Sequence, residues 1–450
     1  MNRTPVPFPR KCREAGDQTK RSRNRLKAAG LCLALVGAVV LRTVVNRGAP
    51  VRPRFLAESV SLSEPPALPT QDPFAASTQL ASLTPLRAAA ESTGRDAAAA
   101  ARFARAALDA QDLLEARGAF AAAMAGDGVK DPGILAGLAE TDARLGRCAE
   151  ALDEYTRVQA SFPDDVRGYV GASQTLDLLG RRRDAVAMLD TALAKLSAND
   201  IAARMRVAAQ YEAFGDVARA LAQVTELLRI APADDDLALL SAHLLIKSGR
   251  PDAAIPVLRQ VLARQPANTR ARYQLGVALL SPSSAHPEPQ LAEDALLTAV
   301  ESNSSETPAY RRLTEMYQEQ GRFRACAYMS LQLLSAIPDS AEARLSLAYA
   351  YGRLGDSAAA TEQRRIAAAL VDRDREIAQL ETEIRQRPTD GALRRALGRL
   401  HARFGRPLQA LAALQAAYIC SRGNIGVARE LGALHRTLGL PAPERIVAQW

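Results

Sequence analysis

The sequence predicts an all-α fold made of stacked helical hairpins, on three observations that recur together along its 450 residues. A glycine returns every 34 or 35 residues over most of the chain. Small residues stand at fixed distances from each glycine, and a proline follows several of them. The recurring glycines are Gly146, Gly180, Gly215, Gly249, Gly321, Gly355, Gly405 and Gly439.

Each period is typical of two amphipathic helices joined at the glycine. Glycine supplies the backbone freedom for the turn, and a proline ends the second helix because it has no N–H to donate. The small residues five positions after each glycine indicate close helix crossings; they are Ala151, Ala185, Ala220, Ala254, Cys326, Ala360 and Ala410. The prolines seventeen positions after it are Pro163, Pro232, Pro266 and Pro338. Since one hairpin cannot bury its apolar face alone, we expect an α-solenoid.

These motifs resemble the tetratricopeptide repeat (TPR) family. The matching residues include Leu275-Gly276 with Ala278, Tyr317 with Gly321, and Ala254 with Pro266, and they lie within roughly 97 to 450. The resemblance implies a superhelix whose first helices line a concave groove. It also implies a role in binding other proteins rather than catalysis.

We expect the solenoid to span 96–450, with about nine repeats and a partial tenth. The first unit lacks the glycine and preserves only the pattern of its second helix, so we interpret it as a degenerate cap. In the sixth unit the loop 281–289 replaces the glycine. The predicted units are 97–131, 132–165, 166–200, 201–234, 235–268, 269–306, 307–340, 341–372, 391–424 and 425–450.

A long helix is predicted near 357–387, where the chain has neither glycine nor proline. Its apolar residues fall on one helical face, at Ile366, Leu370, Ile377, Leu380 and Ile384. We place the charged residues, Arg373 among them, off that face and on the surface. The helix is either an overlong second helix packed on the next repeat or a surface for self-association, and both interpretations stay open.

The amino-terminal region has a different composition. Residues 1–27 carry nine basic groups, and residues 28–41 carry no charge. We expect 1–27 to be a basic cytoplasmic tail, 28–45 a transmembrane signal anchor and 46–95 a proline-rich disordered linker. This predicts a single-pass protein of the bacterial inner membrane with its repeats on the periplasmic side. The alternative is a secreted protein whose signal is cleaved.

Composition weighs against nucleic-acid binding. The formal net charge is +9, but the aromatic content is only 4%. Single-stranded nucleic acids are bound by basic residues interleaved with aromatic ones. The sequence also contains no nucleotide-binding glycine loop, nucleophile elbow or paired zinc-ligand motif. We therefore expect no enzymatic activity and no cofactor. Cys326 and the histidines His401 and His435 are interpreted as packing residues.

The candidate site is a basic surface on the last two units. The resemblance implies that residues ten, six and three positions before the glycine face the groove. Arginines spaced by four residues share a helix face, and guanidinium groups bind carboxylates with two hydrogen bonds. We predict that this surface binds an acidic peptide or helix of a partner protein. Its residues are Arg395, Arg399, Arg403, Arg429 and Arg436.

The sequence thus predicts a membrane-tethered scaffold for protein–protein interactions. One alternative is an accessory docking subunit of an envelope polysaccharide-synthesis or secretion machine. A second is the repeat region of a transferase. The sequence disfavours the second because the repeats continue to the last residue.

Overall fold

A computed structural model describes residues 65, 80–92, 96–125, 131–285, 287–303 and 305–440. The chain divides into two compact units, Met1–Val60 and Ser61–Trp450, and every described residue lies in the second. In these residues all regular secondary structure is helical, and no strand occurs. The all-α prediction is confirmed for the part of the chain that the structure describes.

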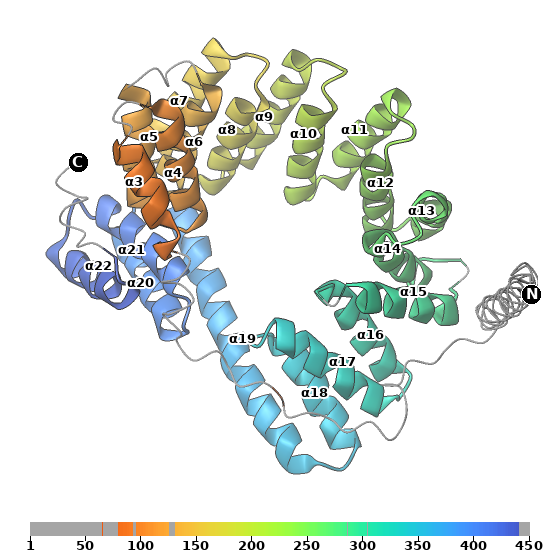
Figure 1. The fold of residues 1–450 in the computed structure, drawn as a ribbon. Helices are drawn as coiled ribbons and strands as arrows, with labels where there is room; N and C mark the ends of the chain where they lie inside the picture. The colour runs from red at the N-terminus through yellow and green to blue at the C-terminus, as the bar shows by residue number, and fades with distance from the viewer. Residues whose placement is uncertain are drawn as a thin grey trace, which may run out of the picture. The chain divides into compact units, whose positions relative to one another are not determined.

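Successive helices pair as hairpins joined by short turns, and each hairpin packs on the next (Figure 1). A single helix, α3, precedes the first hairpin, and α22 follows the last. The helices are α3 Leu83–Ser92, α4 Ala97–Asp109, α5 Leu113–Ala125, α6 Pro132–Arg144, α7 Cys148–Ser161, α8 Val166–Leu178, α9 Arg182–Lys195, α10 Ile201–Ala213, α11 Val217–Ile230, α12 Asp235–Lys247, α13 Pro251–Arg264, α14 Thr269–Leu279, α15 Pro289–Ser302, α16 Thr307–Glu319, α17 Phe323–Ala336, α18 Ala341–Arg353, α19 Ser357–Gln386, α20 Gly391–Arg403, α21 Pro407–Cys420 and α22 Ile425–Leu438.

The recurring glycines stand where the first helices of eight repeats end. All eight have a positive φ, between 67° and 92°, which a residue with a Cβ adopts only at a cost. The first repeat has no such glycine, and Gln111 takes a φ of 64° between α4 and α5. The first unit is therefore a complete hairpin, although its sequence preserves only the pattern of the second helix.

A polar residue caps the first helix of most repeats. Its side chain accepts a hydrogen bond from a backbone N–H in the first turn, which has no acceptor within the helix. These caps also recur with a period near 34 residues and so fix where each repeat starts. They are Asp96, Asp131, Asp165, Asp200, Asp234, Asn268, Ser340, Asp390 and Asn424.

The second helices end and pack as the sequence predicts. Helices α7, α11, α13 and α17 each stop two residues before their proline. The small residues five positions after the glycine are 0% or 1% exposed, from Ala151 to Ala410, and they include Cys326 at 0%. Close helix crossings at these positions therefore build the core of each hairpin.

The segment for which the sequence predicts a long helix is α19, a single helix of 30 residues. Its face of buried residues, from Ala360 to Ile377, packs against α18 and α20. The apolar stripe considered for self-association is thus largely covered by the chain itself. The exposure expected for Arg373 is wrong, because its side chain is only 3% exposed. Arg373 forms ion pairs with Asp339 at 2.9 Å and Asp374 at 2.8 Å, which compensate the burial of its charge.

The helical array begins before residue 96. Helix α3 lies inside 46–95, where we expected a linker without helices, and Leu80 and Leu83 are 4% and 3% exposed against the first hairpin. Pro85 falls in the first turn of α3, where a missing N–H costs little. The predicted tail at 1–27 and anchor at 28–45 lie outside the described residues. Among the described residues, no helix is both long enough and apolar enough to cross a membrane.

The two ends of the array meet. Helix α21 contacts α5, and leucines from both ends share one buried cluster that includes Leu113, Leu114, Leu411 and Leu431. In Figure 1 the blue helices α20 to α22 lie beside the orange helices α3 to α5. Helix α19 carries the chain about 45 Å toward this contact, at 1.5 Å per residue. We call the contact between α5 and α21 the closure seam.

A polar group at the seam is fully buried. The side chain of Gln415 on α21 is 0% exposed. Its oxygen accepts hydrogen bonds from the backbone N–H groups of Leu113 at 2.8 Å and Leu114 at 3.4 Å, and its nitrogen donates to Asp112 at 2.8 Å. Leu113 and Leu114 open α5, so their N–H groups have no acceptor within their own helix. Gln415 therefore caps the first turn of α5, a helix that lies about 300 residues earlier in the sequence.

Candidate protein-binding site

The five arginines of the predicted basic surface lie on α20 and α22. Helix α20 presents Arg395, Arg399 and Arg403, whose side chains are 29%, 60% and 64% exposed. Helix α22 presents Arg429 and Arg436, both exposed. Both helices are first helices of their repeats, which is the placement that the sequence analysis expected.

Glu430 on α22 joins two of these arginines and is absent from the sequence-based site. Arg395 donates to its carboxylate at 2.5 Å, and Arg399 donates to the same oxygens from one turn further along α20. Hydrogen bonds from Arg399 and then Arg395 lower the pKa of Glu430 to about 2. Glu430 is therefore ionised near neutral pH, and it neutralises one of the two positive charges beside it.

The other three arginines are less constrained. Arg403 lies 3.4 Å from Glu376 of α19, and both side chains are more than half exposed, so this pair contributes little to stability. Arg429 and Arg436 form no ion pair with any residue that the structure describes. The surface thus keeps a net positive charge, concentrated on α22 and at the end of α20.

A cavity of about 510 Å³ lies between α20, α21 and α22. Arg399, Arg403 and Glu430 stand at its edge. Its apolar lining comes from Ala402, Gly405, Pro407, Leu414, Ala433 and Leu434. On α22, Arg429 and Arg436 are four residues before and three after Ala433, so they lie on the same side of the helix. The combination of an apolar lining and an arginine edge suits an amphipathic segment with acidic residues.

Local sequence explains why this cavity is open. Gly398 lets α20 approach α21 closely, because a Cβ there would lie 2.8 Å from Leu414. Ala402 and Ala433 are small residues on facing first helices, where larger side chains would fill the space. The sequence pattern predicts the arginines but not this apolar lining.

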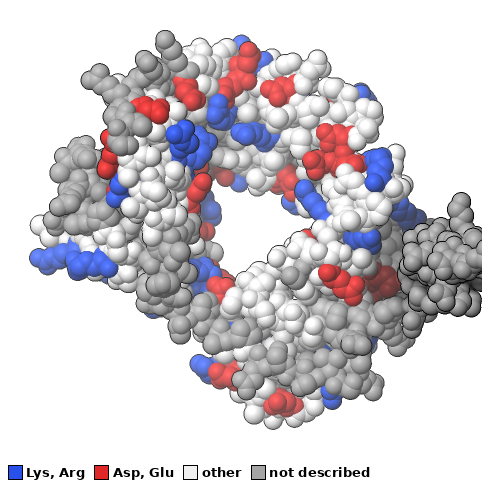
Figure 2. Space-filling model, viewed as in Figure 1, with Lys and Arg blue, Asp and Glu red and all other residues white. Residues whose placement is uncertain are grey.

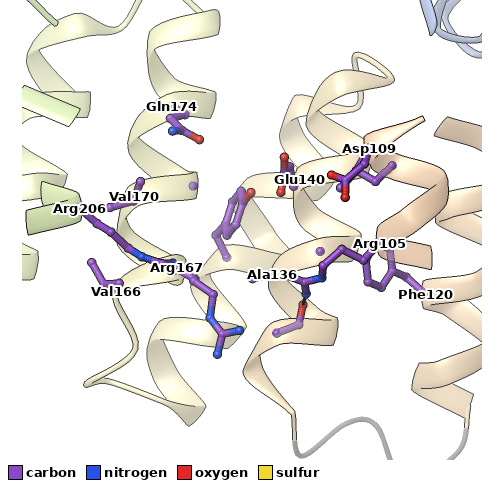
Figure 3. A pocket seen from close by; sticks show the side chains of 15 residues that line it. Arg105, Asp109, Phe120, Ala136, Glu140, Val166, Arg167, Val170, Gln174 and Arg206 are labelled. Atoms are coloured by element: carbon purple, nitrogen blue, oxygen red, sulfur yellow. Dashed lines mark hydrogen bonds between the residues drawn. The ribbon is translucent and has the colours of Figure 1, made fainter. Parts of the chain in front are cut away.

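A second cavity, of about 240 Å³, lies among the first helices at the other end of the array (Figure 3). Its lining includes Phe120 and Tyr155, which reach it from the second helices α5 and α7. Gly137 and Gly171 make room for these rings, since a Cβ at either position would overlap the aromatic carbons. The two glycines are 34 residues apart, and this spacing could have indicated the cavity from sequence.

Charge around the second cavity is mixed. Arg105 donates to the carbonyl of Gly133 at 3.2 Å, and Arg167 pairs with Asp165 at 2.6 Å. Asp109 and Glu140 also line it, beside Arg105 in Figure 3. Figure 2 likewise shows basic and acidic side chains intermingled on the face that it presents. This cavity therefore lacks the charge asymmetry of the one beside α22.

The two histidines considered in the sequence analysis are packing residues. His401 is 8% exposed and His435 is 1% exposed. Burial, followed by the charges of Arg406 and Arg373, lowers the pKa of His401 to about 4, so its ring is neutral near pH 7. Within the described residues, no group of three or more histidine, cysteine or carboxylate side chains could hold a metal ion.

Comparison with known proteins gives one family match. Residues 239–301, which run from α12 to α15, match the tetratricopeptide repeat family model. None of the curated proteins matches the sequence.

Several solved structures are similar over part of the chain. MamA is 22% identical, covers 38% of this chain and 96% of its own, and gives a TM-score of 0.34. YrrB, described as a TPR protein with an unusual peptide-binding site, is 20% identical, with coverages of 42% and 95% and a TM-score of 0.30. PilW, described as a type IV pilus biogenesis factor, is 19% identical, with coverages of 44% and 90% and a TM-score of 0.37.

The family match and the periodic turns agree with each other. Within 239–301, Gly249 has the positive φ and Ala254 the complete burial that recur in the other hairpins. Residues 239–301 are thus tetratricopeptide repeats, and the neighbouring hairpins follow the same helix–turn–helix plan.

Proposed function

We propose that the chain is a scaffold for protein–protein interactions, and that the cavity between α20 and α22 binds an amphipathic, acidic segment of a partner protein. The observation that carries the proposal is the cavity of about 510 Å³ with an apolar lining and an arginine edge. An apolar face of a bound helix or peptide would fill the lining, and its carboxylates would meet Arg403, Arg429 and Arg436.

The bonds made by Glu430 support this assignment. Because Arg395 and Arg399 both donate hydrogen bonds to Glu430, they neutralise its negative charge, which then opposes an acidic partner less. Arg403, Arg429 and Arg436 remain to attract acidic groups. Electrostatic attraction of this kind raises association rates and weakens as salt concentration increases.

We further propose that residues 28–45 tether this scaffold to the bacterial inner membrane, with the helices on the periplasmic side. The support is the sequence pattern of a basic tail followed by an uncharged segment. A carboxyl-terminal reporter that works only in the cytoplasm should give no signal in the full chain. A strong signal would contradict the topology without bearing on the cavity.

The binding proposal is tested by affinity capture from detergent-solubilised membranes with the full chain as bait. The variant Arg403→Glu, Arg429→Glu, Arg436→Glu reverses the charge of three exposed arginines on α20 and α22, and it spares both arginines that Glu430 binds. We expect this variant to lose the captured partner. The matched control, Arg375→Glu with Arg385→Glu, changes exposed arginines on α19 and should capture the partner as the wild type does.

A second variant tests the apolar lining without changing charge. Ala433 is exposed on α22 and lines the cavity, so Ala433→Trp should fill the cavity while preserving the fold. We expect capture to fall at least tenfold, with unchanged circular dichroism. Wild-type capture by both this variant and the charge-reversed variant would show that the partner binds elsewhere.

A further inference from the structure

Beside the closure seam, two cysteines that are far apart in sequence come near each other. Cys148 is the first residue of α7, and Cys420 is the last residue of α21. The Cys420 thiol donates a weak hydrogen bond to the Leu145 carbonyl at 3.6 Å. A Cβ built on Gly146 would lie 2.9 Å from the Cys420 sulfur. Cys420 therefore rests against the turn that leads directly into Cys148.

The two thiols lie near each other, because the charge of a Cys420 thiolate is one of the causes that raise the pKa of Cys148. Gly146 and Cys148 are two residues apart, a span of at most about 7 Å. Disulfides join residues whose Cα atoms lie about 4.4 to 6.8 Å apart, and side-chain rotation sets the final sulfur positions. Both cysteines are free thiols in the structure.

The same corner has room for an oxidant and a charge that favours thiolate. A cavity of about 490 Å³, lined from both ends of the array, contacts Cys148, Arg394 and His401. The Arg394 guanidinium donates to the Pro388 carbonyl at 2.9 Å and lies against Gly146. Its positive charge lowers the pKa of both thiols, whereas burial raises it by more.

We propose that Cys148 and Cys420 form a disulfide-forming site that locks the array in its closed arrangement. A low-molecular-weight disulfide is the oxidant. The thiolate of one cysteine attacks a sulfur of the oxidant and releases one thiolate. The second cysteine then attacks the mixed disulfide and releases the other, so two protein thiols and one disulfide become one protein disulfide and two small thiols.

The consequence is a redox-dependent lock. The bond would close a loop of about 270 residues, so it would restrict opening of the seam far more than a local link does. Because burial leaves little thiolate near neutral pH, the reaction should accelerate as pH rises.

The test uses the full reduced chain in detergent, treated with oxidised glutathione at pH 7 and pH 8.5, and peptide mapping without reduction. We expect the peptide pair linked through Cys148 and Cys420 to be the main intramolecular disulfide, and to form several-fold faster at pH 8.5. The oxidised monomer should melt at a higher temperature than the reduced one. Urea-unfolded chain is the matched control, and it should lose the preference for this pair.

Two further variants keep the test independent of any one substitution. Gln415→Leu removes the seam hydrogen bonds but neither thiol, and it should slow the linkage several-fold. Cys326→Ser removes a buried thiol away from the seam and should leave the linkage unchanged. The proposal is wrong if the folded wild type ends with glutathione on either cysteine separately, or with both thiols free, after oxidation that links the unfolded control.

Discussion

The Gln415 side-chain oxygen accepts a hydrogen bond from the Leu113 backbone N–H at 2.8 Å, although the two residues are 302 positions apart. The bond joins the last complete hairpin to the first. It also supplies an acceptor that α5 cannot provide for its own first turn. If the ends of the solenoid remained apart, the Gln415 side-chain oxygen and the Leu113 N–H would lose this hydrogen bond.

We expect Gln415→Leu to lower the free energy of unfolding by about 1–3 kcal/mol, because it leaves the N–H groups of Leu113 and Leu114 and the Asp112 carboxylate without their buried partner. Chemical denaturation monitored by circular dichroism measures the change. Gln409→Leu on the same helix is the control, since residue 409 is exposed and should tolerate the change. Equal stability of the two variants would show that the seam is not populated in solution.

Glu115 predicts a pH-dependent stability. Burial, and then the charge of Asp112, raises its pKa to about 7 from an ordinary value of 4.5. The folded state therefore binds its proton more tightly than the unfolded state does. Stability is lost as pH rises from about 4.5 to about 7, and the loss is complete above that range.

Glu115→Gln should remove this loss. We expect it to stabilise the chain by about 1–3 kcal/mol at pH 8 and to change little at pH 4.5, as measured by thermal melts at both values. Glu140→Gln is the control, because the Glu140 side chain is 44% exposed on α6, against 16% for Glu115. A Glu115→Gln effect of the same size at both pH values would contradict the assigned pKa.

Gly137 and Gly118 should respond oppositely to alanine. A Cβ at Gly137 would overlap the Phe120 ring, so Gly137→Ala should destabilise the chain by about 1–3 kcal/mol through overpacking. A Cβ at Gly118 on α5 would meet nothing within 4 Å, so Gly118→Ala should stabilise by about 0.5–1 kcal/mol. Thermal melts of the two variants give the comparison, and a shift of the same sign in both would refute the packing described for Phe120.

Arg373 should behave as a buried residue. Arg373→Ala leaves Asp339 with only Arg406 and opens space beside Phe404, so we expect a loss of about 2–4 kcal/mol. Arg375 on the same helix is 72% exposed, and Arg375→Ala should stay within about 0.5 kcal/mol. If denaturation curves of these two variants coincide, α19 does not pack on α20 as described.

Local features of the fold could be predicted from the sequence. The eight glycines mark the turns because a positive φ is a property of one residue and its neighbours. The alanines at the helix crossings could be predicted for a similar reason, because the helical periodicity determines which positions of two paired helices contact each other. The turn at Gln111 could not be predicted, because glutamine takes a left-handed conformation only where surrounding contacts compensate the cost.

The sequence pattern places Arg373 on the buried face of the helix, although we expected this residue at the surface. It lies three residues after Leu370 and four before Ile377, on the same face as both. We expected Arg373 to be exposed because its side chain is charged. The ion pair that compensates its burial is formed with Asp339, which belongs to another repeat. For the candidate site, the arginines were identifiable, whereas Glu430 and the apolar lining depend on how α20 and α22 face each other.

The closure seam could not be predicted from one sequence. Its contacts join residues about 300 positions apart, and the sum of small rotations between hairpins decides whether the ends meet. No local sequence pattern around residue 113 or residue 415 specifies the sum of these rotations. The long α19 is the sequence feature most directly related to the path of the chain.

The most direct test of the closed array is hydrogen exchange at the backbone amides of Leu113 and Leu114 in the full chain. If the array is closed, Gln415 protects both amides, and Gln415→Leu should accelerate their exchange markedly. The first amides of α9, Arg182 and Arg183, follow a residue that makes no side-chain cap and provide the unprotected reference. Exchange at Leu113 and Leu114 as fast as at that reference in the wild type would contradict closure.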